Sequence, residues 1–112
     1  MSVEVEVVGE VSGELVEAFG RLLPQLSRSA TPLDRQALAR IVACPVTTVL
    51  LARSQGRIVG TLTLVVFPIP SGLRARIEDV VVDAAARGQG VGAALTLAAL
   101  RLAREQGPGP WT

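Results

Sequence analysis

The stretch Arg87–Gly92, of sequence RGQGVG, constrains the fold of this chain more than any other. It follows the strand-like run Ile77–Val82 and precedes Ala93–Glu105, whose residues favour a helix. Glycines at such a turn let the backbone come close to a ligand, and consecutive N–H groups then point the same way. The positive end of the helix dipole adds to the attraction for an anion. The sequence therefore predicts a phosphate-binding turn between a strand and a helix.

Length and charge narrow the class of protein. The chain has 112 residues, of which 49% are hydrophobic, so we expect one domain over residues 1–112. Its net charge of +1 gives no electrostatic reason to expect a nucleic-acid partner. Its apolar stretches are far shorter than the ~20 residues of a membrane span, and the alternating start MSVEVE does not resemble a secretory signal. We therefore expect a cytoplasmic protein without a membrane partner.

The absence of certain residue types excludes several kinds of chemistry. Cys44 is the single cysteine, and the chain has no histidine. An internal disulfide is therefore impossible, and we expect no metal site. The absence of His also removes the Ser-His and Cys-His nucleophile pairs that many hydrolases use.

Hydrophobic periodicity predicts seven elements in the order β-α-α-β-β-β-α. Ser12 is placed to cap the first helix, and Thr31 to cap the second, with Pro32 at its first position. A tight turn at Ser54–Gly56 joins two strands as a hairpin, and Pro68–Leu73 is expected to be a loop. Strands are expected at 3–8, 47–53, 57–67 and 76–82, and helices at 13–26, 32–44 and 93–105.

The glycine turn is open to several interpretations. Gly88-x-Gly90-x-x-Ala93 fits a dinucleotide-binding pattern, but that pattern belongs near the start of a βαβ unit, and no strand follows the last helix here. A nucleotide P-loop ends in Gly-Lys-Ser/Thr, and this turn has no Lys. A plain tight turn at a helix start needs one glycine, whereas this one has three in five residues beside Arg87.

The stretch Ile77–Leu95 resembles the acetyl-CoA-binding motif of the GCN5-related N-acetyltransferase (GNAT) family, which reads Gln/Arg-x-x-Gly-x-Gly/Ala. Arg87, Gly90 and Gly92 stand at its three fixed positions. The upstream order β-α-α-β-β-β is also similar to the first half of that family. The resemblance implies an α/β fold of the GNAT type, with a mixed, mostly antiparallel sheet flanked by helices, and acetyl-CoA as cosubstrate.

The same resemblance implies which residues hold the cosubstrate. The N–H groups of the turn would bind the pyrophosphate, and the main chain of the preceding strand would pair with the pantetheine arm as if it were a further strand. The expected binding residues are Val80, Val81, Val82, Arg87, Gly88, Gln89, Gly90, Val91, Gly92 and Ala93. A helix N-terminus suits a pyrophosphate, and an extended amide chain can pair with a strand edge.

The implied reaction is acetyl transfer to a primary amine, on a small molecule or on a protein N-terminus or Lys. Glu78 is the candidate general base, because an acidic residue near this point of the strand serves so in some relatives. Asp79, expected on the opposite face of the strand, is the second choice. Both could instead be polar strand residues, or pair with Arg74 or Arg76. The N–H of Val80 would polarise the carbonyl, and no general acid can be named.

The resemblance further implies a strand, a helix and a closing hairpin after the last helix. Gly107–Thr112, of sequence GPGPWT, carries two prolines and does not favour a central strand. We therefore expect the C-terminal strands of the family to be absent, and Val80–Val82 to form an exposed edge that makes the protein a homo-oligomer. The apolar side chains of this run are expected to be covered on both faces of the sheet. The alternative function is a non-catalytic module that binds coenzyme A or only assembles.

Overall fold

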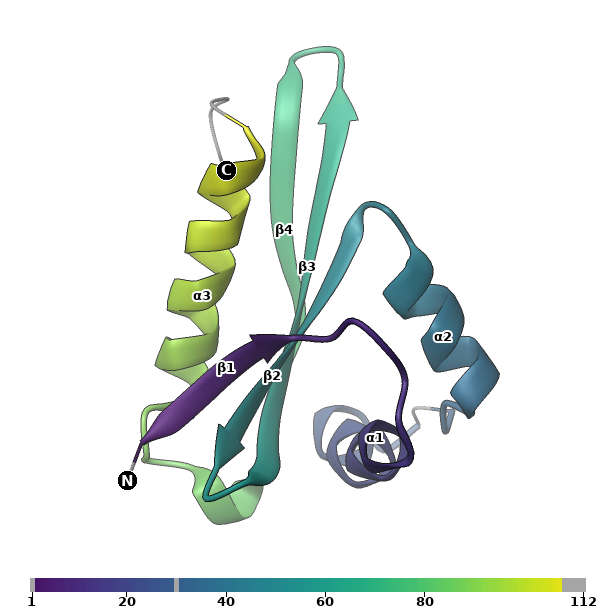
Figure 1. Ribbon diagram of the computed structural model, residues 1–112, viewed down its shortest axis with the longest axis vertical. Coiled ribbons are helices and arrows are strands. Elements are labelled where there is room, and N and C mark those ends of the chain that lie inside the picture. Colours follow the sequence, from purple (N-terminus) through teal and green to yellow (C-terminus); the bar gives the residue numbers. More distant parts are fainter. Residues whose placement is uncertain (1, 30, 108–112) are drawn as a thin grey trace.

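The chain folds into a four-stranded antiparallel sheet with helices on both faces, which confirms the α/β class and the order of elements (Figure 1). The computed structural model describes residues 2–29 and 31–107. Within these residues, no helix has both the length and the apolar character needed to cross a membrane. The strands are β1 (Val3–Val7), β2 (Thr47–Ser54), β3 (Arg57–Ile69) and β4 (Gly72–Val82), in that order across the sheet. The helices are α1 (Gly13–Leu26), α2 (Arg35–Ala43), the short 3₁₀ helix η1 (Ala84–Ala86) and α3 (Val91–Gln106).

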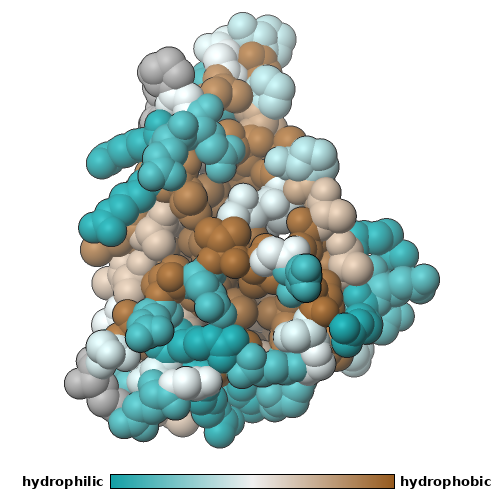
Figure 2. Space-filling view, viewed as in Figure 1, coloured by the Kyte–Doolittle hydropathy of each residue, from teal (hydrophilic) through white to brown (hydrophobic). Residues whose placement is uncertain are grey.

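Two hydrophobic clusters hold the helices to the sheet. Figure 1 shows α3 on one side of the strands, and α1 with α2 on the other. In the same view, apolar side chains gather down the middle of the molecule, between the helices of the two sides (Figure 2). On the α3 side the buried residues include Leu50, Leu62, Leu64, Val91, Leu95 and Ala99, and on the α1 side Leu15, Phe19, Leu22, Leu38, Leu51 and Val81.

The first helix forms where the sequence predicts it. The Ser12 hydroxyl accepts a hydrogen bond from the Leu15 N–H at 3.1 Å, which confirms the expected cap. The residues spaced three and four apart on this helix, Leu15, Ala18, Phe19 and Leu22, are all buried. The turn between β2 and β3 is also confirmed, with left-handed backbone at Gln55 and Gly56.

The start of the second helix differs from the prediction. Asp34, not Thr31, is the N-cap, and its carboxylate accepts a hydrogen bond from the Ala37 N–H at 2.7 Å. The helix therefore begins at Arg35, and Pro32 lies before it. A charged acceptor makes a stronger bond to a helix N-terminus than a hydroxyl does, which favours the later start.

The expected loop at 68–73 is wrong, because β3 and β4 continue as a hairpin in which Ile69 pairs with Gly72. Pro68 remains in β3 and pairs with Leu73. A proline is tolerated here because β2 pairs with β3 only as far as Val65. The N–H group that Pro68 lacks would therefore have had no partner strand on that side.

Candidate active site

The turn before α3 has the backbone that a ligand cradle needs. Gly88 and Gly90 adopt left-handed φ values of 84° and 80°. A Cβ at either position would meet no atom within 4 Å, so the demand for glycine comes from conformation and not from space. The helix begins at Val91, two residues earlier than expected, with Gly90 as its N-cap.

The N–H groups of this turn face solvent. The first helical bond of α3 joins the Ala94 N–H to the Gly90 carbonyl at 3.0 Å. Within the described part of the chain, the N–H groups of 88–93 donate to no protein acceptor. Arg87, Gly88, Gln89 and Gly90 are exposed, whereas the Val91 side chain is buried. The turn therefore presents a row of N–H donors and a cation at the positive end of a helix, which suits a phosphate.

The first turn of α3 lies tight against the sheet. A Cβ on Gly60 of β3 would lie 2.9 Å from Val91 Cγ1 and 3.1 Å from the Val81 carbonyl oxygen. Only glycine leaves room for this contact, so Gly60 fixes how close the N-terminus of α3 comes to β4. The sequence does offer a signal for this contact, because an isolated glycine inside a strand is typical of a bulge or of a close approach by another part of the chain.

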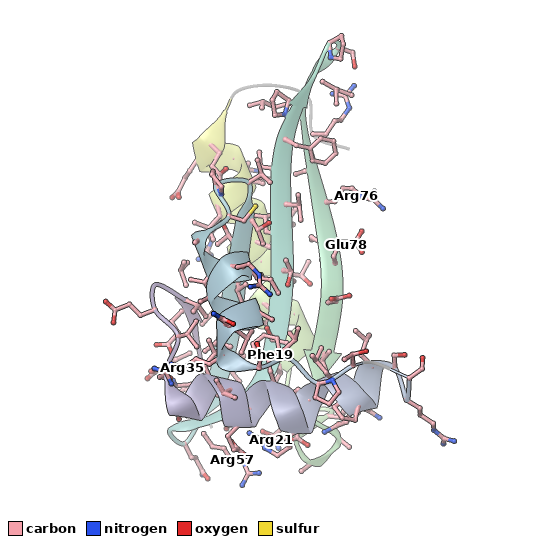
Figure 3. All side chains as sticks on the ribbon, turned by 90° about the vertical axis from the view of Figure 1, so that its right-hand side faces the viewer. Phe19, Arg21, Arg35, Arg57, Arg76 and Glu78 are labelled. Carbon is pink, nitrogen blue, oxygen red and sulfur yellow. The ribbon has the colours of Figure 1, made fainter. Side chains whose placement is uncertain are left out.

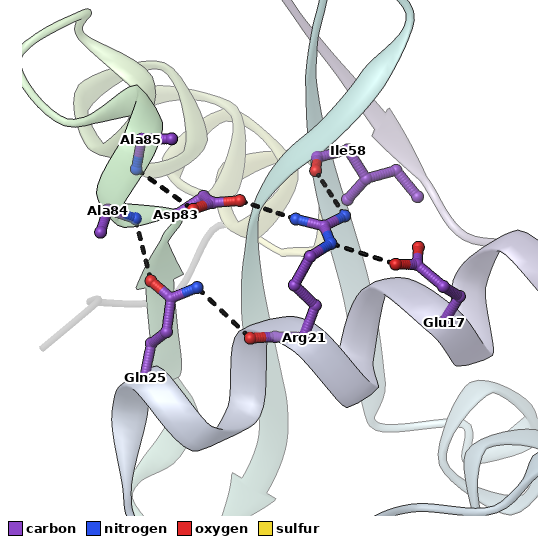
Figure 4. Close-up of polar contacts among 7 residues, drawn as sticks. All are labelled: Glu17, Arg21, Gln25, Ile58, Asp83, Ala84 and Ala85. Carbon is purple, nitrogen blue, oxygen red and sulfur yellow. Dashed lines mark hydrogen bonds and ion pairs between the residues drawn. The ribbon is translucent and has the colours of Figure 1, made fainter.

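An ion pair ties the entry of the turn to α1 (Figure 4). Arg21 Nη1 lies 2.7 Å from Asp83 Oδ2, and Arg21 Nη2 donates to the Ile58 carbonyl at 3.1 Å. Asp83 also accepts from the Ala85 N–H at 3.2 Å, which caps η1. That backbone bond, with help from Gln25 and the Arg21 charge, lowers the pKa of the Asp83 carboxyl. Sequence reasoning missed this pair, although an Asp directly after a strand and before Ala84 is a recognisable cap signal.

Beyond β4 the sheet has an open edge, since no other described strand pairs with its outer side. The Asp83 N–H donates to the Val59 carbonyl of β3 at 2.7 Å. In an antiparallel strand, the main-chain N–H and C=O groups of successive residues point alternately toward and away from the neighbouring strand. Because those of Asp83 point toward β3, those of Val82 face the open edge.

The side chains of this run are covered unequally. The side chain of Val81 is buried, but Val80 is 39% exposed. The expectation that both faces of this run are covered is therefore wrong for Val80, because it lies on an edge strand beside a bulge.

The bulge sits at Asp79. Thr61 pairs with Val81 and Thr63 with Glu78, so Asp79 and Val80 together stand opposite Leu62. Asp79 takes a left-handed φ of 49°. The extra residue breaks strict alternation, and Asp79 borders a hollow on the α1 and α2 face together with Thr63, the cross-strand partner of Glu78. The two carboxylates border different hollows, Asp79 this one and Glu78 one between β4 and α3.

Glu78 forms the ion pair that the sequence left open as an alternative. Its carboxylate lies 3.0 Å from Arg76 Nη2, and both side chains point outward from β4 (Figure 3). Arg74 instead donates to the Ser71 hydroxyl at 2.9 Å. Both partners of the Glu78 pair are well exposed, so the pair is weak and leaves the carboxylate free to exchange partners. Glu78 also borders a hollow of about 670 Å³ between β4 and α3.

Residues 14–109 match the acetyltransferase (GNAT) family. The chain belongs to this family. Among solved structures it is similar to a Trypanosoma brucei acetyltransferase, with a TM-score of 0.78 and 29% identity over 99% of this chain and 81% of that one. No curated protein sequence matches the chain significantly.

Two further structures show the same fold at lower identity. An aminoglycoside acetyltransferase from an uncultured soil metagenomic sample, solved in complex with sisomicin, gives a TM-score of 0.84 at 23% identity, over 98% of this chain and 75% of that one. A ribosomal-protein-alanine N-acetyltransferase from Brucella melitensis biovar Abortus 2308 gives 0.77 at 19% identity, over 99% and 78%. The GNAT fold expected from the glycine motif is thus confirmed, and the domain belongs to a family of N-acetyltransferases.

The GNAT domain brings the predicted residues together at one edge of the sheet. Val80–Val82 lie on the open strand, and Arg87–Ala93 follow after one turn of η1. Glu78 lies at the other side of the bulge from Val80. The end of β4, the glycine turn and the start of α3 therefore follow one another along the same edge of the sheet.

Proposed function

We propose that this GNAT domain binds acetyl-CoA and transfers its acetyl group to a primary amine. The observation that carries the proposal is the row of N–H groups from Gly88 to Ala93, which have no acceptor among the described residues and lie at the helix N-terminus beside the open edge of β4. The amine belongs to a small molecule or to a protein N-terminus or Lys.

The residues present fit the cosubstrate in two places. The turn offers donors and the Arg87 cation to the two negative phosphates. The outward main-chain groups of the 80–82 run can pair with an extended amide arm, since they face no described strand. Acetyl-CoA would supply the activated acetyl thioester.

Glu78 is the proposed general base. A primary amine is protonated at neutral pH, as Lys is, and must lose a proton before its nitrogen can bond to the acetyl carbon. The Glu78 carboxylate accepts that proton and passes it to solvent. The neutral nitrogen then bonds to the acetyl carbon and gives its second proton to the same carboxylate, while the C–S bond breaks and the leaving thiolate takes a proton from solvent. The N–H of Val80 stabilises the charge that develops on the carbonyl oxygen.

Isothermal titration with acetyl-CoA tests the binding step. Gly90→Glu puts bulk and negative charge into the turn and is expected to weaken binding at least about tenfold, a loss of ~1.4 kcal/mol. Gly56→Glu is the matched control, because Gly56 has a similar φ of 78° and an equally open surrounding but lies in the β2–β3 turn. Absence of heat at millimolar acetyl-CoA would overturn the proposal.

Turnover is a separate measurement. The rate of free-thiol release across a panel of amines should exceed background, and Glu78→Gln should lower that rate about 10²-fold or more.

The second candidate function is a non-catalytic module that binds coenzyme A. Clear binding of acetyl-CoA with thiol release at background would support it. The open β4 edge and the Glu78–Arg76 pair are the observations that favour this candidate.

A further inference from the structure

The face of the sheet covered by α1 and α2 carries a second hollow, of about 360 Å³. Figure 3 looks onto this face, with Phe19 between α1 and the strands. The walls come from both helices and the segment between them, and the floor comes from the strands. The lining residues are Phe19, Leu23, Leu26, Ser27, Thr31, Leu33, Leu38, Ile41, Val49, Thr63 and Asp79.

These walls are mostly hydrocarbon. Leu23 and Leu26 of α1 stand on one side and Ile41 of α2 on another, while the polar groups are three hydroxyls and one carboxylate. A site of this kind binds through apolar contact and uses its few polar groups to orient the ligand. Its volume is near the lower end for ligand sites, so the occupant is small.

Asp79 supplies the one charge among the described residues that line the hollow. Among the described residues its carboxylate forms no hydrogen bond or ion pair, whereas neighbouring Glu78 is paired with Arg76. The described residues that line the hollow include no basic one. The bulge, with φ of 49° at Asp79, is what gives this side chain its place there. An unpaired carboxylate beside apolar walls attracts a cation that carries an apolar body.

The hollow and the proposed acetyl site meet at the bulge. Asp79 stands between Glu78 and Val80 on β4. An ammonium held by Asp79 would therefore lie one residue away from both the proposed base and the proposed pantetheine-binding run. This step rests on the acetyltransferase function proposed above.

We propose that this hollow is the acceptor site, and that the acceptor is a small primary amine on an apolar body, such as an arylalkylamine. Its ammonium pairs with Asp79 and its body lies against Phe19, Leu23 and Leu26. Polyhydroxylated amines are poor acceptors, because the walls would strip water from their hydroxyls and return few hydrogen bonds.

Calorimetric titration of the whole chain without acetyl-CoA tests the site. 2-Phenylethylamine is expected to bind, and 2-phenylethanol and glucosamine to bind about tenfold more weakly or not at all. Asparagine and glycine both tolerate a left-handed backbone. Asp79→Asn and Asp79→Gly are therefore each expected to weaken the binding of 2-phenylethylamine about tenfold. Leu26→Ser removes an exposed wall residue and should weaken binding of the amine several-fold. Glu105→Gln, at an exposed position of α3 outside the hollow, should leave amine binding unchanged.

Equal affinity for 2-phenylethylamine and 2-phenylethanol would overturn the role of Asp79, as would unchanged amine binding in both of its variants. Tighter binding of glucosamine than of 2-phenylethylamine would overturn the apolar acceptor class. Amine binding is measured here without acetyl-CoA, so a failure of the cosubstrate proposal leaves this result standing. A failure of amine binding beside normal acetyl-CoA binding would sink this inference alone.

Discussion

At the scale of single residues, glycines decide where the site can form. Gly88 and Gly90 supply backbone conformations that other residues rarely adopt, and Gly60 supplies empty space for Val91. The first two shape the turn itself. Gly60 is far from the turn in sequence, yet it sets the distance between the start of α3 and the sheet.

Gly60→Ala is expected to lower the free energy of unfolding by about 1–3 kcal/mol, because the new methyl overlaps Val91 and the Val81 carbonyl. Urea unfolding followed by circular dichroism measures the change. Gly20→Ala is the control, since Gly20 lies in α1 with nothing within 4 Å of its Cβ position, and alanine there should be neutral or stabilising. Equal stability of Gly60→Ala and wild type would show that α3 can shift without cost.

At the scale of elements, one ion pair joins three parts of the molecule. Arg21 of α1 contacts Asp83, which caps η1 and directly follows β4, and it also binds the Ile58 carbonyl of β3. Both side chains of the pair are largely buried, with 22% and 12% exposed. The pair therefore fixes the segment that leads into the glycine turn.

Arg21→Met keeps the apolar stem and removes the charge, which leaves Asp83 without its cation. The expected loss is about 1–3 kcal/mol of unfolding free energy, measured by chemical denaturation. Glu17→Gln removes the exposed partner on the same arginine and should cost less than about 0.5 kcal/mol. Similar losses in the two variants would contradict a special role for Asp83.

The lowered pKa of Asp83 makes stability depend on pH. A carboxyl whose pKa is lower in the folded state adds stability above its unfolded value of ~3.9, and loses it as pH falls through the folded value. Wild type should therefore weaken progressively from about pH 5 downward. Asp83→Asn should be less stable at pH 7 and show a shallower decline in acid. A parallel decline in both proteins would mean that other carboxyls, such as Glu14, dominate acid unfolding.

At the scale of the whole molecule, the two edges of the sheet differ in character. β1 carries Glu4 and Glu6, and Glu6 pairs with Arg53 at 2.9 Å. β4 instead exposes Ile77 and Val80, at 38% and 39%, and Ile77 lines the same hollow as the exposed Leu100 of α3. Charged edges resist pairing with other chains, whereas apolar ones favour it.

We predict that the chain associates with itself through the part of β4 that carries Ile77, before the bulge, which leaves the main chain of 80–82 open to the cosubstrate. Size-exclusion chromatography with light scattering should show a species larger than a monomer at micromolar concentration. Ile77→Lys should shift it toward monomer, and Val7→Lys on β1 should not. A stable wild-type monomer under these conditions would contradict the prediction.

Much of the fold could be predicted because it depends on short-range patterns. Ser12 and the apolar spacing of Leu15–Leu22 placed α1, and the turn at Gln55–Gly56 placed the first hairpin. The errors occurred where two local signals compete. Asp34 displaced Thr31 as a cap, and the pairing partners of β3 allowed a hairpin through Pro68 that proline chemistry alone argues against.

The sequence by itself determined the order of elements and the glycine-rich turn, because periodicity and a left-handed φ are properties of a few neighbouring residues. The tertiary structure alone decided the bulge at Asp79, the contact between Gly60 and Val91 and the Arg21–Asp83 pair. Each of these depends on the register of two strands, or on residues far apart in the chain that meet only when helices pack on the sheet. For this reason the glycine-rich turn before α3 could be predicted from its motif, whereas the proposed acceptor hollow could not.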